Sequence, residues 1–287
     1  MSAAQPGTKP YYYIPQPSHW PITGSCALLL MALGAAFWMN HVPAGPWILL
    51  AGVCVLVFMM YGWFGTVIGE SERRLYNKRV DTSFRWSMSW FIFSEVMFFA
   101  AFFGALFYIR NLSVPDLGGI TSKELIWPDF VAGWPSVGPY ITEQFTPMAA
   151  WGIPALNTMI LLTSGVTLTI AHHALKAGHR GQLKLWLFIT IVLGFTFLGF
   201  QAYEYHHAWT EMGLRLSTGV YGSTFYMLTG FHGFHVTIGA IMLSVMLGRA
   251  LRGHFDAEHH FAFEAAAWYW HFVDVVWILL FIIVYWL

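Results

Sequence analysis

Charged residues are scarce in this chain. Asp, Glu, Lys and Arg make up 10% of its 287 residues, whereas an ordinary soluble domain carries roughly 25%. Because a water-exposed surface needs charged groups, this shortage excludes an ordinary soluble globular protein. The 14 basic and 14 acidic residues also cancel, which argues against the net-basic surface of a nucleic-acid-binding protein. The composition therefore indicates a protein whose main solvent is lipid.

Cysteine is nearly absent, and so are the motifs of soluble enzymes. The two cysteines, Cys26 and Cys54, fall in different apolar runs at depths that differ by roughly 10 Å. That separation excludes a disulfide, whose Cα atoms lie about 4.4–6.8 Å apart. The sequence contains no phosphate-binding glycine loop, no G-x-S-x-G and no C-x-x-C, so the corresponding soluble-enzyme chemistries lack their residues.

Long uncharged runs dominate the chain instead. A bilayer core of about 30 Å requires about 20 apolar residues per helix. Seven runs of this kind predict transmembrane helices over 22–39, 47–68, 86–109, 153–175, 185–205, 221–248 and 265–287. Backbone groups in lipid must be hydrogen-bonded within their own segment, which favours helices over strands. The predicted fold class is an all-α integral membrane protein with seven transmembrane helices.

Residues 69–85, GESERRLYNKRVDTSFR, form the most charged stretch. They divide the chain into an N-terminal tail with two helices (1–68), a charged cytoplasmic linker (69–85) and five further helices (86–287). A cytoplasmic N-terminus places most Lys and Arg residues on the inner side, as the positive-inside rule requires. The seventh crossing then leaves the C-terminus outside. The first twenty residues lack the pattern of a cleaved signal peptide, so we expect an uncleaved chain.

Two acidic residues lie deep inside predicted helices. Glu95 falls near the middle of 86–109, and Asp274 follows His271 by three residues on one helical face. A charged group that faces lipid at mid-bilayer costs at least about 2.5–3.5 kcal/mol, so both acids should face protein or water, or stay protonated. For Glu95 we favour a neutral, hydrogen-bonded acid over a proton relay. His271 and Asp274 are interpreted as a structural polar pair.

The thirteen histidines raise the question of a metal. A single di-iron site is excluded because the adjacent-histidine clusters lie at opposite ends of the predicted helices, about 30 Å apart. The outer group is His206 and His207, and the inner group is His172, His173, His254, His259 and His260. The inner group with Glu264 remains a candidate metal site, although contacts with lipid headgroups or a partner are the favoured interpretation. Glu70, Arg249 and Arg252 also lie at inner helix ends, where basic groups suit lipid phosphates or serve as plain interfacial anchors.

Several longer motifs carry a family resemblance. The longest is FEAAAWYWHFVDVVW at 263–277. The others are WPITG at 20–24, GES at 69–71, FSEVMFF at 93–99, LNT at 156–158, AHHAL at 171–175, YGSTF at 221–225 and GFHGFHVTIG at 230–239. Together they resemble, in order and over nearly the whole chain, subunit III of the haem-copper cytochrome c oxidases.

This resemblance implies a non-catalytic core subunit of a proton-pumping oxidase of aerobic respiration. The first two helices would form an arm splayed from a five-helix bundle, with structural phospholipids in the V-shaped cleft between them. The chain would pack on the catalytic subunit I, support proton uptake and prolong the working life of the enzyme. Haem and copper would belong to partner subunits, so we expect no catalytic residue, metal or redox cofactor in this chain.

The resemblance also assigns residues. Glu95 matches the family's intramembrane carboxylate, and Glu70 and Arg249 match residues near the lipid headgroups, to which we add Trp63 and His254. Family members often have two adjacent tryptophans where this chain has Trp63 followed by phenylalanine.

Three other functions remain open: subunit III of a quinol oxidase, an independent histidine-rich membrane metalloenzyme, and a proton-coupled transporter that uses Glu95 and Asp274. Quinol oxidase relatives typically lack the first two helices, so their presence favours cytochrome c as the electron donor. No transit peptide is evident. We therefore expect a bacterial plasma membrane, with the mitochondrial inner membrane as the alternative.

Overall fold

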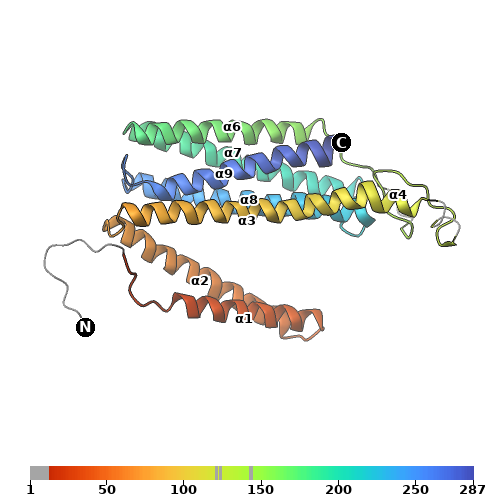
Figure 1. The fold of residues 1–287 in the computed structure, drawn as a ribbon, viewed down its shortest axis with the longest axis horizontal. Coiled ribbons are helices and arrows are strands. Elements are labelled where there is room, and N and C mark those ends of the chain that lie inside the picture. Colours follow the sequence, from red (N-terminus) through yellow and green to blue (C-terminus); the bar gives the residue numbers. More distant parts are fainter. Residues whose placement is uncertain (1–12, 120–121, 123–124, 142–144) are drawn as a thin grey trace. The chain divides into compact units, whose positions relative to one another are not determined.

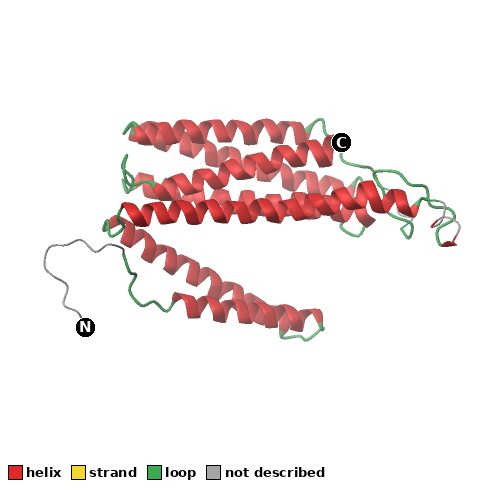
Figure 2. Cartoon of the chain, viewed as in Figure 1, coloured by secondary structure: helices red, strands yellow, loops and turns green. Residues whose placement is uncertain are grey.

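The computed structural model describes residues 13–119, 122, 125–141 and 145–287, and over these residues the chain is helical and contains no strand (Figure 2). Within the same residues, seven helices are long and apolar enough to cross a membrane. They span Trp20–Met39, Gly45–Glu72, Lys78–Leu117, Ile153–Lys176, Arg180–Thr210, Gly219–Leu251 and Phe261–Trp286. The predicted all-α fold with seven transmembrane helices is therefore confirmed.

The chain forms two compact units, Met1–Phe84 and Arg85–Leu287. The charged segment 69–85 is mainly helical, because α2 (Gly45–Glu72) continues into it and α3 (Lys78–Tyr108) begins inside it. Glu, Lys and Arg are good helix formers, so a helix can continue past the point where the apolar run ends. The side chain of Asn77 caps α3, since its Oδ1 accepts the N–H groups of Arg79 and Val80 at 3.1 Å each.

The first unit is built on the hairpin of α1 (Trp20–Met39) and α2. Both helices carry a proline at their start, where the missing N–H costs nothing. Their backbones approach closely at glycines: a Cβ on Gly34 would collide with the backbone of Leu49, and one on Gly52 would lie 2.7 Å from the backbone nitrogen of Met31. Small residues allow this close packing between membrane helices. The two cysteines in these helices are free, as predicted.

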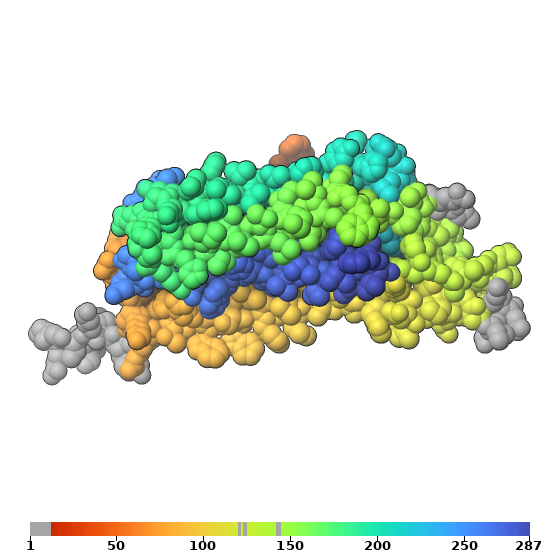
Figure 3. Space-filling model, turned by 90° about the horizontal axis from the view of Figure 1, so that it is seen from above, coloured from red at the N-terminus to blue at the C-terminus, as the bar shows by residue number. Residues whose placement is uncertain are grey.

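Among the described residues, the second unit contains most of α3 and four further long helices (Figure 1). These are α6 (Ile153–Lys176), α7 (Arg180–Thr210), α8 (Gly219–Leu251) and α9 (Phe261–Leu280). α3 continues through η1 (Ile109–Ser113) into α4 (Val114–Leu117), and α9 continues into η2 (Phe281–Trp286). In the space-filling view α6, in green, lies beside α9, in blue (Figure 3). In the most apolar 18-residue stretch of Phe261–Trp286, which contains α9, 50% is buried, whereas the corresponding share in Lys78–Leu117, which contains α3, is 11%. The helix α9 is therefore the central helix of the unit.

Trp270 on α9 is the centre of this core. The indole Nε1 donates a hydrogen bond to the Ser164 hydroxyl on α6 at 2.9 Å. A Cβ on Gly194 of α7 would lie 2.6 Å from the ring, and one on Gly239 of α8 would lie 2.8 Å from it. One large ring therefore packs against small residues on three helices. This packing fixes the positions of the helices that carry the polar groups described next.

Candidate functional site

Glu95 on α3 and His235 on α8 form a polar pair inside the second unit. The distance between Glu95 Oε2 and His235 Nε2 is 2.8 Å, and the side chains are 21% and 9% exposed. The other ring nitrogen, Nδ1, lies 2.6 Å from the carbonyl oxygen of Phe231. The Glu95 carboxyl group is therefore directed at a partner helix, which is one of the alternatives that its position in the sequence left open.

The geometry specifies where one proton of this pair resides. A carbonyl oxygen can only accept a hydrogen bond, so His235 Nδ1 must carry a hydrogen and donate it to Phe231. The short contact at Nε2 then requires a second proton, either on Glu95 beside a neutral imidazole or on His235 beside a carboxylate. In both forms the pair as a whole is neutral. A neutral pair that shares one proton meets the low-dielectric interior without a net buried charge.

Aromatic rings surround the imidazole of His235. The ring centroids of Phe99, Phe98 and Tyr269 lie 5.0, 5.8 and 6.3 Å from that of His235. These apolar neighbours lower the local dielectric, which strengthens the hydrogen bond to Glu95.

The other predicted pair, His271 and Asp274, lies within α9. His271 Nδ1 is 3.5 Å from Asp274 Oδ2, with the side chains 44% and 8% exposed. The opposite ring nitrogen of His271 is 3.4 Å from the Thr169 hydroxyl on α6, and Gly165 on α6 leaves no room for a Cβ beside the Asp274 carboxylate. These contacts join α9 to α6, which suits the structural role predicted for the pair.

The residues predicted to bind lipid headgroups are divided between the two units. Arg249, at the end of α8, is 7% exposed, and its guanidinium carbon lies 4.6 Å from the centroid of the Phe255 ring. The backbone N–H of His254 donates to the Arg249 carbonyl oxygen at 3.1 Å, so these two residues do lie together. Trp63, on α2 of the first unit, is 48% exposed.

Glu70, also in the first unit, is held by two tyrosines. Tyr13 and Tyr76 donate their hydroxyl hydrogens to its two carboxylate oxygens at 3.0 and 2.7 Å. Burial, and then the hydrogen bond to Glu70, raise the pKa of Tyr76. The carboxylate therefore has fixed partners within its own unit.

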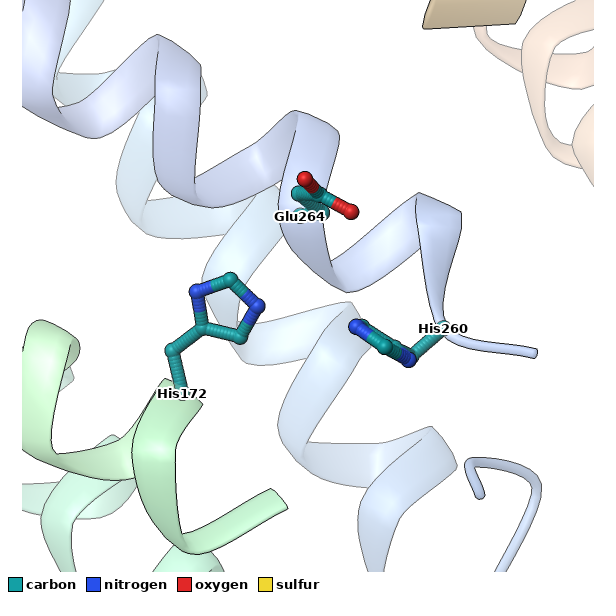
Figure 4. Close-up of side chains that lie close together, drawn as sticks. All are labelled: His172, His260 and Glu264. Carbon is teal, nitrogen blue, oxygen red and sulfur yellow. The ribbon is translucent and has the colours of Figure 1, made fainter. Parts of the chain in front are cut away.

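A second cluster joins the ends of α6 and α9 (Figure 4). His172 comes from the last turns of α6, and His260 and Glu264 come from the start of α9. One ligand atom from each of the three lies within 4.8 Å of the others. Arg85 contacts the same carboxylate, with Nη1 2.7 Å from Glu264 Oε1. The sequence placed these histidines at one depth, whereas the selection of these three residues and the involvement of Arg85 come from the tertiary structure.

The loop before α9 holds His260 in place. Asp256 Oδ1 accepts the backbone N–H groups of Glu258 and His259 at 2.9 and 2.6 Å. Burial opposes the charged form of Asp256, but these hydrogen bonds outweigh it and lower the pKa of the carboxyl group. The Asp256 carbonyl oxygen lies 3.2 Å from His260 Nδ1, so it receives the hydrogen of that nitrogen.

Sequence reasoning overlooked one buried acid. Glu204 on α7 is 1% exposed, and its Oε1 accepts the Tyr285 hydroxyl hydrogen at 2.7 Å. The sequence placed Glu204 at the end of an apolar run, where an acid normally meets water. The sequence does contain the partner, a tyrosine near the end of the last helix. The two residues are 81 positions apart, so the sequence alone does not indicate that they pair.

Known proteins resemble this chain over nearly its whole length. Residues 10–287 match the family described as Cytochrome c oxidase subunit III. The proteins named Cytochrome c oxidase subunit 3 from Dugong dugon and Carassius auratus are each 42% identical over 276 residues, which cover 96% of this chain and 96% of each relative. The protein of the same name from Tetraodon nigroviridis is 43% identical over 277 residues, with the same coverage.

Proposed function

Because the chain belongs to the cytochrome c oxidase subunit III family, we propose that it is a non-catalytic core subunit that packs on subunit I of a proton-pumping oxidase. The observation that carries this proposal is the family match over residues 10–287. The complex is an oxidoreductase, and this chain is one of its membrane subunits. Haem and copper, in this proposal, are held by the partner subunits.

Packing on subunit I requires apolar surface, and the second unit offers it. One face of α6 carries exposed apolar side chains at helical spacing. They are Leu156, Met159, Leu162, Val166 and Ile170. Such a face is suited to another membrane helix or to lipid chains.

The second part of the proposal concerns phospholipid. Arg249 and His254 are joined by a backbone hydrogen bond at the end of α8, and basic residues at a helix end are suited to lipid phosphates. Trp63 on α2 has the amphipathic ring typical of a membrane interface. We assign headgroup contacts to these residues and to Glu70, each within its own unit.

The third part concerns protons and enzyme endurance. Glu95 and His235 share one proton within a 2.8 Å contact, so the pair is able to hold a proton inside the membrane. We assign it a supporting role in proton handling, with oxygen reduction carried out in subunit I. By sustaining proton supply, the subunit would prolong activity over many turnovers.

The membrane orientation follows from the loops. The charged segment 69–85 and the helix ends on either side of the α6–α7 and α8–α9 connections carry ten of the 14 Lys and Arg residues, so we place these ends and the N-terminus in the cytoplasm. The C-terminus then lies outside. We retain the bacterial plasma membrane as the location and the mitochondrial inner membrane as the alternative, which the animal relatives favour.

One purification tests the proposal. The chain is tagged at its C-terminus, purified in mild detergent and analysed for its co-migrating proteins and its optical spectrum. We expect a haem-containing catalytic subunit in the complex and no haem band in the chain once it is dissociated. Stoichiometric haem or copper in the dissociated chain would overturn the non-catalytic assignment.

A second experiment tests the endurance role. Oxidase prepared with and without this chain is compared for its initial rate of oxygen consumption and for the decline of that rate during turnover. We expect similar initial rates and a faster decline without the chain. Equal declines would contradict the role in endurance.

A further inference from the structure

His172, His260 and Glu264 converge on one point between two helices (Figure 4). Their ligand atoms lie within 4.8 Å of one another, although the chain separates His172 from the other two by more than eighty residues. The three side chains point toward a shared space at the ends of α6 and α9.

Both imidazoles present a buried ring nitrogen that has no hydrogen-bond partner. This nitrogen is Nε2 in His172 and in His260. In His260 the opposite nitrogen, Nδ1, donates to the Asp256 carbonyl oxygen, so Nε2 of the neutral ring carries a lone pair. Such an outer hydrogen bond fixes the tautomer and ring orientation of metal-binding histidines. A buried nitrogen lone pair without a partner therefore needs an explanation.

We propose that His172, His260 and Glu264 bind a divalent transition-metal ion of the zinc type. Two imidazoles and one carboxylate are donors that zinc prefers, whereas calcium and magnesium favour sites made entirely of oxygen. Three protein ligands leave a fourth tetrahedral position for water. Zinc bonds of about 2.0–2.1 Å place ligand atoms roughly 3.3 Å apart, so the site closes by rotation of its side chains when the ion binds.

Arg85 tunes this site. Its Nη1 binds Glu264 Oε1 at 2.7 Å, which orients the carboxylate and leaves Oε2 to bind the ion. The guanidinium charge also repels a cation and competes for the carboxylate. Removing the Arg85 charge should therefore tighten metal binding, whereas a simple structural ion pair would predict no gain.

A bound ion would link the end of α6 to the start of α9 and, through Arg85, to α3. The proposal goes beyond the role of the chain in the oxidase and does not depend on it, because the site is made entirely of this chain's own residues. It also differs from the expectation of no metal that the family resemblance implied, and it narrows the candidate site that the sequence left open among the inner histidines to three residues.

Zinc binding to the full chain provides the test. The chain, purified in detergent with the subunits it retains, is freed of exchangeable metal by a chelator and titrated with Zn²⁺. Bound zinc is measured by equilibrium dialysis and elemental analysis.

The variants His172→Asn and Glu264→Gln should each lose one tight equivalent. The matched control is His173→Asn, since His173 is the exposed neighbour of His172 and lies outside the cluster, and it should retain that equivalent. Arg85→Gln should bind this ion at least tenfold more tightly.

X-ray absorption at the zinc edge of the wild-type protein gives an independent measurement that needs no variant. We expect a shell of nitrogen and oxygen neighbours that contains two imidazoles. Absence of a tight equivalent in the wild type, the same loss in His173→Asn, or a shell without imidazole would each overturn the proposal. If a variant fails to assemble, the absorption spectrum of the wild type still decides.

Discussion

Replacing Glu95 by alanine removes the hydrogen-bond partner of His235 Nε2, an atom on a side chain that is 9% exposed. A buried polar group left without its partner costs about 1–3 kcal/mol. Hydrogen bonds between membrane helices average about 0.6 kcal/mol and reach about 1.7 kcal/mol. The structure thus predicts a loss of about 1 kcal/mol in the free energy of unfolding for Glu95→Ala.

Glu95→Gln should behave differently, because the glutamine amide can donate to the same ring nitrogen. We expect less than half of the alanine effect. It should also leave assembly and oxygen reduction largely intact, because the assigned role of the pair is supportive. The matched control is Ser94→Ala, since Ser94 is exposed and its hydroxyl bonds only to its own helix, at the Phe91 carbonyl oxygen.

Unfolding by sodium dodecyl sulfate in mixed micelles measures the stability differences, and oxygen uptake measures turnover. Infrared difference spectra of wild type against Glu95→Gln show in addition whether a protonated carboxyl band is lost. Equal destabilisation by alanine and glutamine would refute the hydrogen-bond reasoning. Loss of most turnover in a fully assembled Glu95→Gln complex would show that the carboxyl group has an essential role.

Three further predictions concern the rest of the chain. Gly34→Val should destabilise the hairpin of α1 and α2, because a Cβ there meets the backbone of α2, whereas Gly65→Val, which meets nothing within 4 Å, should not; limited proteolysis compares them. The pKa of Tyr76 is raised from 10.0 by burial and by its bond to Glu70, so its stabilisation is fully present below the unfolded-state value of 10.0 and is lost as pH rises from there through the folded-state value. Tyr76→Phe should abolish this alkaline loss in thermal unfolding at graded pH. Arg249→Ala should reduce the phospholipid that co-purifies, and unchanged lipid phosphorus would contradict the headgroup assignment.

The sequence alone was sufficient to predict the seven helices. Bilayer thickness sets a minimum apolar length, and runs such as 221–248 meet it without help from neighbouring segments. The helix ends were less predictable. α7 extends from Arg180 to Thr210, beyond the apolar run 185–205, because charged and aromatic residues continue a helix into the interface.

The pairing of polar groups was only partly predictable. The depth of Glu95 predicted only that it avoids lipid, by facing protein or water or by staying protonated, and its partner His235 is 140 residues away. His271 and Asp274 were readable as a pair because they lie three residues apart on one helix. For Glu204 and Tyr285, sequence reasoning found neither the burial nor the partner.

What the sequence by itself determined is the set of properties that depend on local composition: a membrane protein, seven helices, their apparent depth and the family. What only the tertiary structure decided is which helix faces meet. The side chain of Trp270 packs against Gly194 and Gly239, and this core brings His172 within reach of His260 and Glu264. Depth places residues along the membrane normal, whereas rotation of each helix about its axis is set by packing against its neighbours, so contacts across helices come only from the fold.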